Sequence, residues 1–182
     1  MSFIESKYAQ EIINFKFPKF KDIPDIGLYM EQMLKLLNTY LSVFAIKEEQ
    51  MMTSTMVNNY VKQKLITPPV NKKYSRTQML YLLVICLLKQ ILNISDIAKL
   101  LEWEKLKYET EVAYNFFCVE IENALHAAFV TRDFSAPTSA KQASEISELF
   151  RSEVLAFANK IYVTKYICYL NDSNAKICYK FL

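Results

Sequence analysis

Apolar residues recur along this chain three to four residues apart, which is the spacing of one helix face, through most of its length. The pattern predicts helices at residues 25–44, 53–65, 75–92, 95–101, 113–128 and 146–168. Side chains that favour the helix N-cap stand at four of these starts, namely Asp25, Thr53 or Ser54, Ser75 and Ser95. The sequence therefore predicts an all-α protein.

Prolines and short polar stretches mark the connections between these helices. Residues 1–26 hold a short helical pattern and then an extended strap, because Pro18 and Pro24 cannot both lie inside a helix. Two further prolines, Pro68 and Pro69, end the second long helix, and residues 70–74 form an extended piece too short for a sheet of its own. Residues 133–139 interrupt the last two helices, which we expect to form a helical hairpin.

Composition narrows the class of protein further. The chain has one glycine in 182 residues, whereas Rossmann domains, Walker-type NTPases and most β-sandwiches need glycine in phosphate-binding loops and tight turns. Hydrophobic residues make up 52% of the chain and include 12 Tyr, 12 Phe and 7 Met. This is more apolar material than a lone domain of this size needs, and it indicates a buried partner surface.

Charge is distributed unevenly along the chain. The net charge is +3, but the stretch from Gln50 to Ser95 contains six basic residues and no acidic one. The remaining residues therefore hold 16 basic and 19 acidic side chains. A one-sided positive field on an otherwise acidic protein indicates a polyanionic partner.

The expected compartment is the cytoplasm. Charges throughout residues 1–20 argue against a secretory signal, and the longest apolar run, Met79–Leu88, is ten residues where a membrane span needs about 20. The cysteines stand far apart, without a C-x-x-C pair, and are expected to be reduced thiols rather than a disulfide framework: Cys86, Cys118, Cys168 and Cys178.

One segment has the order of a winged helix-turn-helix: helix, proline-stopped loop, basic extended wing, helix, short turn, helix. Within it stand T-S-T-M-V-N-N-Y-V-K-Q-K-L-I from Thr53, then K-K-Y-S from Lys72, and I-L-N-I-S-D-I from Ile91. These residues resemble the DNA-binding head of the MerR family of bacterial regulators. In that family the helix reads T-L-R-x-Y-x-x-x-G-L, the wing Y-R-x-Y-S, and the next turn L-G-x-S-L-x-E-I. The combination of N-N-Y-V-K with K-K-Y-S is closer still to an uncharacterised bacterial family known only as a domain of unknown function.

The resemblance covers residues 18–101 and implies a division of the chain. The N-terminal helix and strap would be residues 1–23, the MerR-like winged helix-turn-helix 24–101, and a C-terminal helical dimerisation or effector region 102–182. Asn58 stands where the family pattern has its helix arginine, Lys64 where it has the helix-ending glycine, and Tyr60 matches the tyrosine that wedges the helix. The implied function is a DNA-binding transcriptional regulator.

Asparagine on an exposed helix face pairs with adenine edges in the major groove, and lysine neutralises phosphates. The candidate contacts to double-stranded DNA are Thr55, Asn58, Asn59, Lys62, Lys72, Lys73, Tyr74 and Arg76. The alternative is a helical protein–protein interaction module with a degenerate head that does not bind DNA.

The sequence offers no constellation for catalysis or for a metal. His126 is the only histidine and stands among apolar residues, so a satisfied or partly exposed histidine is favoured over a ligand or base. We expect no enzyme, no metal site and no cofactor. A set of aromatic residues either lines a pocket for an unidentified effector or belongs to the core or a dimer interface: Tyr108, Tyr114, Phe116, Phe117, Tyr162, Tyr166 and Tyr169. The apolar stripes at 113–128 and 146–168 predict a homodimer, because a lone hairpin would leave them exposed.

Overall fold

The computed structural model describes residues 2–46 and 49–172 of the chain. Its helices are α1 (Lys7–Ile13), α2 (Met30–Leu41), α3 (Ser54–Lys62), α4 (Arg76–Leu88), α5 (Ile94–Lys107), α6 (Thr110–His126) and α7 (Glu145–Asp172). Short helical turns follow or join them at η1 (Phe20–Asp22), η2 (Ser42–Phe44) and η3 (Ala127–Thr131), and two strands are added by β1 (Leu28–Tyr29) and β2 (Lys73–Tyr74). The predicted all-α class is confirmed.

The two strands join segments that are 45 residues apart in the chain. Leu28 pairs with Tyr74 and Tyr29 with Lys73 in antiparallel register, so β1 lies beside the turn and strand of residues 70–74, which we call the wing. Gly27 permits this approach, because a Cβ atom there would lie 3.0 Å from the Cβ of Lys73. The prediction that Asp25 caps the first long helix is therefore wrong. Residues 28–29 are held extended by the wing, and α2 begins only at Met30.

Local capping explains where most helices begin. Ser75 caps α4, accepting from the Gln78 N–H, while the Gln78 side chain accepts from the Ser75 N–H, which is a capping box. Thr53 caps α3 in the expected place. Asn93, rather than Ser95, caps α5, because its Oδ1 accepts from the Asp96 N–H at 3.0 Å. That helix also runs to Lys107, beyond the predicted end at residue 101.

Helix α4 lies at the centre of the molecule. Every residue from 82 to 88 is buried, and the helix has no polar face to turn toward solvent. It packs against α2 on one side and α7 on another. The helix ends at Leu88, four residues before the predicted end, and residues 89–92 form a turn. One continuous hydrophobic core therefore joins the head around α2 and α3 to the C-terminal helices.

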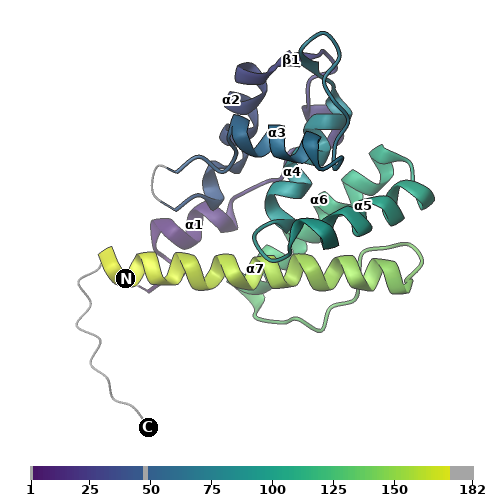
Figure 1. Ribbon diagram of the computed structural model, residues 1–182. Helices are drawn as coiled ribbons and strands as arrows, with labels where there is room; N and C mark the ends of the chain where they lie inside the picture. The colour runs from purple at the N-terminus through teal and green to yellow at the C-terminus, as the bar shows by residue number, and fades with distance from the viewer. Residues whose placement is uncertain (1, 47–48, 173–182) are drawn as a thin grey trace.

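The C-terminal half is the expected pair of helices, α6 and α7, packed along each other (Figure 1). The stripes that predicted a homodimer are buried within this single chain, from Phe117, Ile121 and Leu125 on α6 to Val154, Phe157 and Ile161 on α7. Their exposure is therefore no reason to expect a dimer. Figure 1 places α7 along one side of the molecule and the wing at the opposite end.

The segment between α6 and α7 is held by a buried ion pair. Arg151 of α7 lies 3.6 Å from Glu120 of α6, and both side chains are nearly inaccessible to solvent. Glu120 Oε1 also accepts from the Ser139 N–H at 2.6 Å. Because an unpaired buried carboxylate is costly, this arrangement fixes residues 132–144 against α6.

None of the helices in the described part of the chain combines the length and apolarity that crossing a membrane requires.

Candidate nucleic-acid interface

Helix α3 presents a polar face beside the wing. Val57 and Tyr60 point into the core, while Ser54, Thr55, Asn58, Asn59 and Lys62 are exposed on the other face. Within the described residues, Thr55, Asn58 and Lys62 have no side-chain hydrogen bond or ion pair, whereas Asn59 accepts from Gln63 at 3.1 Å. The face predicted to meet DNA is therefore accessible, and most of its polar groups are available to a partner.

Helix α3 ends in a common C-terminal turn, in which a lysine, Lys64, occupies the position that is usually glycine. The Leu65 N–H donates to the Tyr60 carbonyl and the Lys64 N–H to the Val61 carbonyl, each at 3.0 Å, which is a Schellman motif. Lys64 occupies the left-handed position with φ 61°, where glycine is normally found. The left-handed conformation costs a residue with a side chain about 1–2 kcal/mol. This turn ends α3 at Lys62, three residues before the predicted end.

The tip of the wing repeats this feature. Val70 and Lys73 exchange two backbone hydrogen bonds of 3.1 and 2.9 Å around the pair Asn71-Lys72. Asn71 has φ 50° and Lys72 has φ 63°, the conformation of a two-residue type I′ hairpin turn. Asn-Gly is the favoured pair in such a turn, so lysine at position 72 replaces the residue that the backbone prefers. Both left-handed lysines are exposed.

Most of the lysine charge on this surface is left without an acidic partner by the residues that the structure describes. Lys62, Lys64 and Lys72 have no ion pair within the described residues, and Lys73 lies with its Nζ 5.2 Å from the centre of the Tyr29 ring. Anions from solution or from a partner are therefore the available counter-charges.

Two of the predicted DNA contacts have other roles. Tyr74 is 3% exposed, so its side chain belongs to the core beneath the wing. Arg76 donates through Nε to the Ile23 carbonyl at 2.9 Å, stacks on Phe20 and lies 3.7 Å from Asp25. It anchors the strap to the start of α4. Tyr74 is therefore buried and Arg76 is held by contacts within the chain, whereas the other predicted residues are exposed on α3 and the wing.

Sequence reasoning missed the residue that holds the wing in place. Gln78 is buried and donates from Nε2 to the carbonyl of Thr67 at 2.8 Å and to that of Pro68 at 3.1 Å. It thereby ties the proline loop to the first turn of α4. The spacing Ser75-x-x-Gln78 is the signature of a capping box and could have pointed to this residue.

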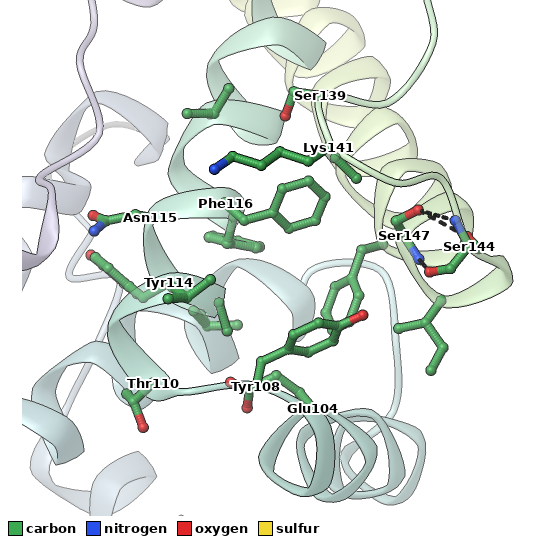
Figure 2. Close-up of a pocket in the computed structure, with 18 of the residues that line it drawn as sticks. Glu104, Tyr108, Thr110, Tyr114, Asn115, Phe116, Ser139, Lys141, Ser144 and Ser147 are labelled. Carbon is green, nitrogen blue, oxygen red and sulfur yellow. Dashed lines mark hydrogen bonds between the residues drawn. The ribbon is translucent and has the colours of Figure 1, made fainter.

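A second candidate site is a cavity of about 820 Å³ between α4, α5, α6 and the start of α7 (Figure 2). The predicted aromatic set is divided between two places. Tyr108, Tyr114, Phe116 and Phe117 line the cavity. Tyr162, Tyr166 and Tyr169 instead surround Phe3, with ring centres 4.6–5.7 Å from it. The first group fits the pocket interpretation. In the second group, Tyr162 and Tyr169 pack against the core, whereas Tyr166 is 37% exposed.

Glu104 is the acidic residue of this cavity, and sequence analysis did not single it out. It is 7% exposed and accepts from the Tyr81 hydroxyl at 3.2 Å. Burial raises the pKa of its carboxyl above the ordinary value, partly offset by the Tyr81 hydrogen bond. The sequence gives no sign that Glu104 is buried, because it is one of several charged residues in the second half of α5.

The remaining chemistry-bearing residues form no site of their own. Cys86, Cys118 and Cys168 are free thiols, and burial raises the pKa of Cys86 and of Cys118 to about 12. Cys178 lies outside the described residues. His126 is exposed, and among the residues that the structure describes no group of His, Cys, Asp and Glu side chains is placed to hold a metal ion.

The fold and the site together define a helical protein with a winged, basic surface at one end. The chain belongs to the family described as Domain of unknown function (DUF1836), whose model matches residues 18–117. This confirms the expected relationship to an uncharacterised family. No curated protein and no solved structure matches the chain.

The limits of the family match coincide with two segments that contact each other. The match begins at Pro18, whose carbonyl accepts from the Tyr114 hydroxyl at 2.9 Å. It ends at Phe117, whose ring centre lies 5.8 Å from that of Phe17. The strap therefore closes on the first half of α6, and the family unit includes this half of α6 as well as the head.

Proposed function

We propose that the head formed by α2, α3 and the wing binds double-stranded DNA, and that the protein is a MerR-like transcriptional regulator of the cytoplasm. The observation that carries this proposal is the exposed surface of α3 and the wing, where Lys62, Lys64 and Lys72 have no ion pair with any described residue and lie beside the exposed amide of Asn58. Lysines of this kind neutralise phosphates, while the amide reads base edges.

The backbone conformation at Lys64 supports the MerR-like interpretation. Lys64 stands where the family pattern has its helix-ending glycine, and it adopts the left-handed conformation that glycine favours. The order of elements agrees as well, since α2, α3, the wing and α4 follow in the sequence of a winged helix-turn-helix. In this arrangement α3 enters the major groove and the wing lies along the adjacent backbone.

The presence of lysine at two left-handed positions also favours a role for their charge. Glycine would relieve the conformational cost at both Lys64 and Lys72. Backbone conformations of this kind persist where a side chain serves a purpose other than stability. Binding to phosphate is the purpose that a lysine without a partner serves best.

Fluorescence anisotropy with labelled duplex DNA at several salt concentrations tests this function. A random-sequence pool measures the non-specific term, and selection from that pool yields a preferred site. Each phosphate that a lysine neutralises contributes about 0.9 to the log–log salt slope, so replacing Lys72 and Lys73 by alanine should lower the slope by about two per protomer. Lys107→Ala, an exposed lysine at the end of α5, is the matched control and should leave the slope unchanged.

The second candidate function is a helical protein–protein interaction module. Exposed apolar side chains at the junction of α5 and α6 favour it, with Trp103 at 48%, Leu106 at 78% and Val112 at 60% exposure. An absence of salt-dependent binding to any duplex at micromolar protein would refute the DNA proposal and leave this alternative. Light scattering on the same sample tests the homodimer that two-fold DNA sites would require.

A further inference from the structure

The cavity between α4, α5, α6 and the start of α7 has the size and walls of a small-molecule site. Its volume of about 820 Å³ lies within the range of about 300–1,000 Å³ that is usual for ligand pockets. Leu80 and Val84 of α4, Phe116 and Phe117 of α6 and Phe150 of α7 supply apolar surface. Residues 139–144 form a further wall, which the buried Glu120–Arg151 pair holds in place.

One charged group lies deep in these apolar walls. Glu104 is 7% exposed, yet no lysine or arginine among the described residues forms an ion pair with it. Its neighbour Lys105 extends over the ring of Tyr81, at 4.5 Å from the ring centre, and its charge favours the Glu104 carboxylate without forming an ion pair. Lys141 is on the wall of residues 139–144, and in Figure 2 it lies at the far side of the cavity from Glu104.

A buried carboxylate with a single hydroxyl partner is energetically costly unless a cation approaches it. The described residues supply the Tyr81 hydroxyl at 3.2 Å and the nearby charge of Lys105, but no cation in direct contact with the carboxylate. Aromatic rings beside the carboxylate would further favour a cationic partner, since the face of an aromatic ring attracts positive charge. The walls therefore select a hydrocarbon or aromatic body, and Glu104 selects a positively charged nitrogen.

We propose that this cavity is a binding site for an apolar organic amine, whose protonated nitrogen pairs with Glu104 and whose hydrocarbon part lies against Phe116 and Phe150. The site does not depend on the proposed DNA binding and is tested without DNA. Its position still matters for the head, because α4 supplies both Leu80 and Tyr81 of the cavity and the capped helix start that follows wing strand β2.

A matched pair of fluorescent probes tests the proposal on the full chain. 1-Pyrenemethylamine carries the cation, and 1-pyrenemethanol has nearly the same shape without the charge. A charge-assisted hydrogen bond in a desolvated site should make the amine bind at least about tenfold more tightly than the alcohol. Equal affinities, or no saturable binding of either probe up to about 100 µM, would overturn the proposal.

Substitutions assign the selectivity to Glu104. Glu104→Gln keeps a hydrogen-bond acceptor for Tyr81 but removes the charge, so the amine-to-alcohol ratio should fall to within about twofold of unity. Glu102→Gln, an exposed acid on the same helix, is the control and should keep the wild-type ratio. Ala113→Phe fills part of the cavity and should weaken both probes by about tenfold or more.

Thermal unfolding verifies that each variant is folded, and the wild-type comparison of the two probes needs no variant at all. A tenfold preference that survives Glu104→Gln would place the cation elsewhere and overturn the assignment. Anisotropy of labelled duplex with and without the amine then reports whether the occupied cavity changes DNA affinity. If the protein without the amine does not bind DNA, the DNA proposal is refuted, but the result for the cavity is unaffected.

Discussion

The left-handed lysine at the wing tip should allow stability and the proposed DNA binding to be changed in opposite directions. Lys72 has φ 63° in the two-residue turn, and glycine at this position should relieve about 1–2 kcal/mol of conformational cost. Glycine also loses more backbone entropy on folding, by about 0.5–1 kcal/mol. Lys72→Gly should therefore stabilise the protein by about 0.5–1 kcal/mol, which corresponds to a rise in Tm of about 1–4 °C for a chain of this size.

The same substitution removes one positive charge from the proposed interface. If Lys72 neutralises one phosphate, the log–log salt slope falls by about 0.9, and affinity at 0.1 M salt falls about eightfold. Lys72→Ala separates the two effects. Alanine keeps a Cβ atom at the left-handed position, so the variant should lose the same charge-dependent affinity without gaining stability.

Thermal unfolding and anisotropy titrations on one preparation of each variant measure both quantities. A lower Tm for Lys72→Gly would refute the turn geometry. An unchanged salt slope in both variants would refute the contact between Lys72 and phosphate. A gain in stability follows from the turn geometry, and a loss of DNA affinity follows from the proposed function. Lys107→Ala should change neither quantity beyond about 0.5 kcal/mol.

Three further substitutions probe the interface and the core. Asn58→Ala should leave unfolding within about 0.5 kcal/mol of wild type but reduce discrimination between a selected site and its mutated versions by about 1–3 kcal/mol, measured by competition binding. Gly27→Ala should cost about 1–3 kcal/mol in denaturant unfolding, because the new Cβ would lie 3.0 Å from the Lys73 Cβ, whereas Ile26→Ala beside it should cost little. Burial raises the pKa of Glu153 from 4.5 to about 7. Between pH 4.5 and pH 7 the Glu153 carboxyl is therefore protonated in the folded state and ionised in the unfolded state. Glu153 should therefore contribute a fall in stability of about 3 kcal/mol as pH rises from about 4.5 to about 7, and Glu153→Gln should remove this contribution in unfolding measured across that range.

The sequence predicted the helices wherever the signal was local. Ser75 and Thr53 cap the helices that they were expected to cap, because N-cap chemistry acts within one turn of the chain. The error at Asp25 has a non-local cause, since β1 is extended by pairing with a strand 45 residues away. At Ser95 the competing cap lies two residues earlier, at Asn93, and both residues are chemically suitable.

The candidate interface was predictable in composition but not in conformation. The absence of acidic residues around α3 and the wing is visible in the sequence, and so is the amphipathic spacing that exposes Asn58. Composition and periodicity do not predict that Lys64 and Lys72 adopt the left-handed conformation, because lysine has no preference for it; the glycine position of the family pattern pointed only to Lys64. The internal role of Arg76 and the cavity around Glu104 depend on tertiary packing, which single-sequence periodicity does not describe.

The burial of α4 on all sides determines how the whole chain responds to mutation. Its amides can reach solvent only if the head separates from α7, so they should exchange with water through global unfolding rather than local opening. The head then has no stability separate from that of the C-terminal helices. A destabilising change in α7 lowers the population of folded head to the same extent as a change in α2. A genetic screen for loss of DNA binding would therefore recover substitutions throughout the core, and only variants with normal unfolding identify the binding surface.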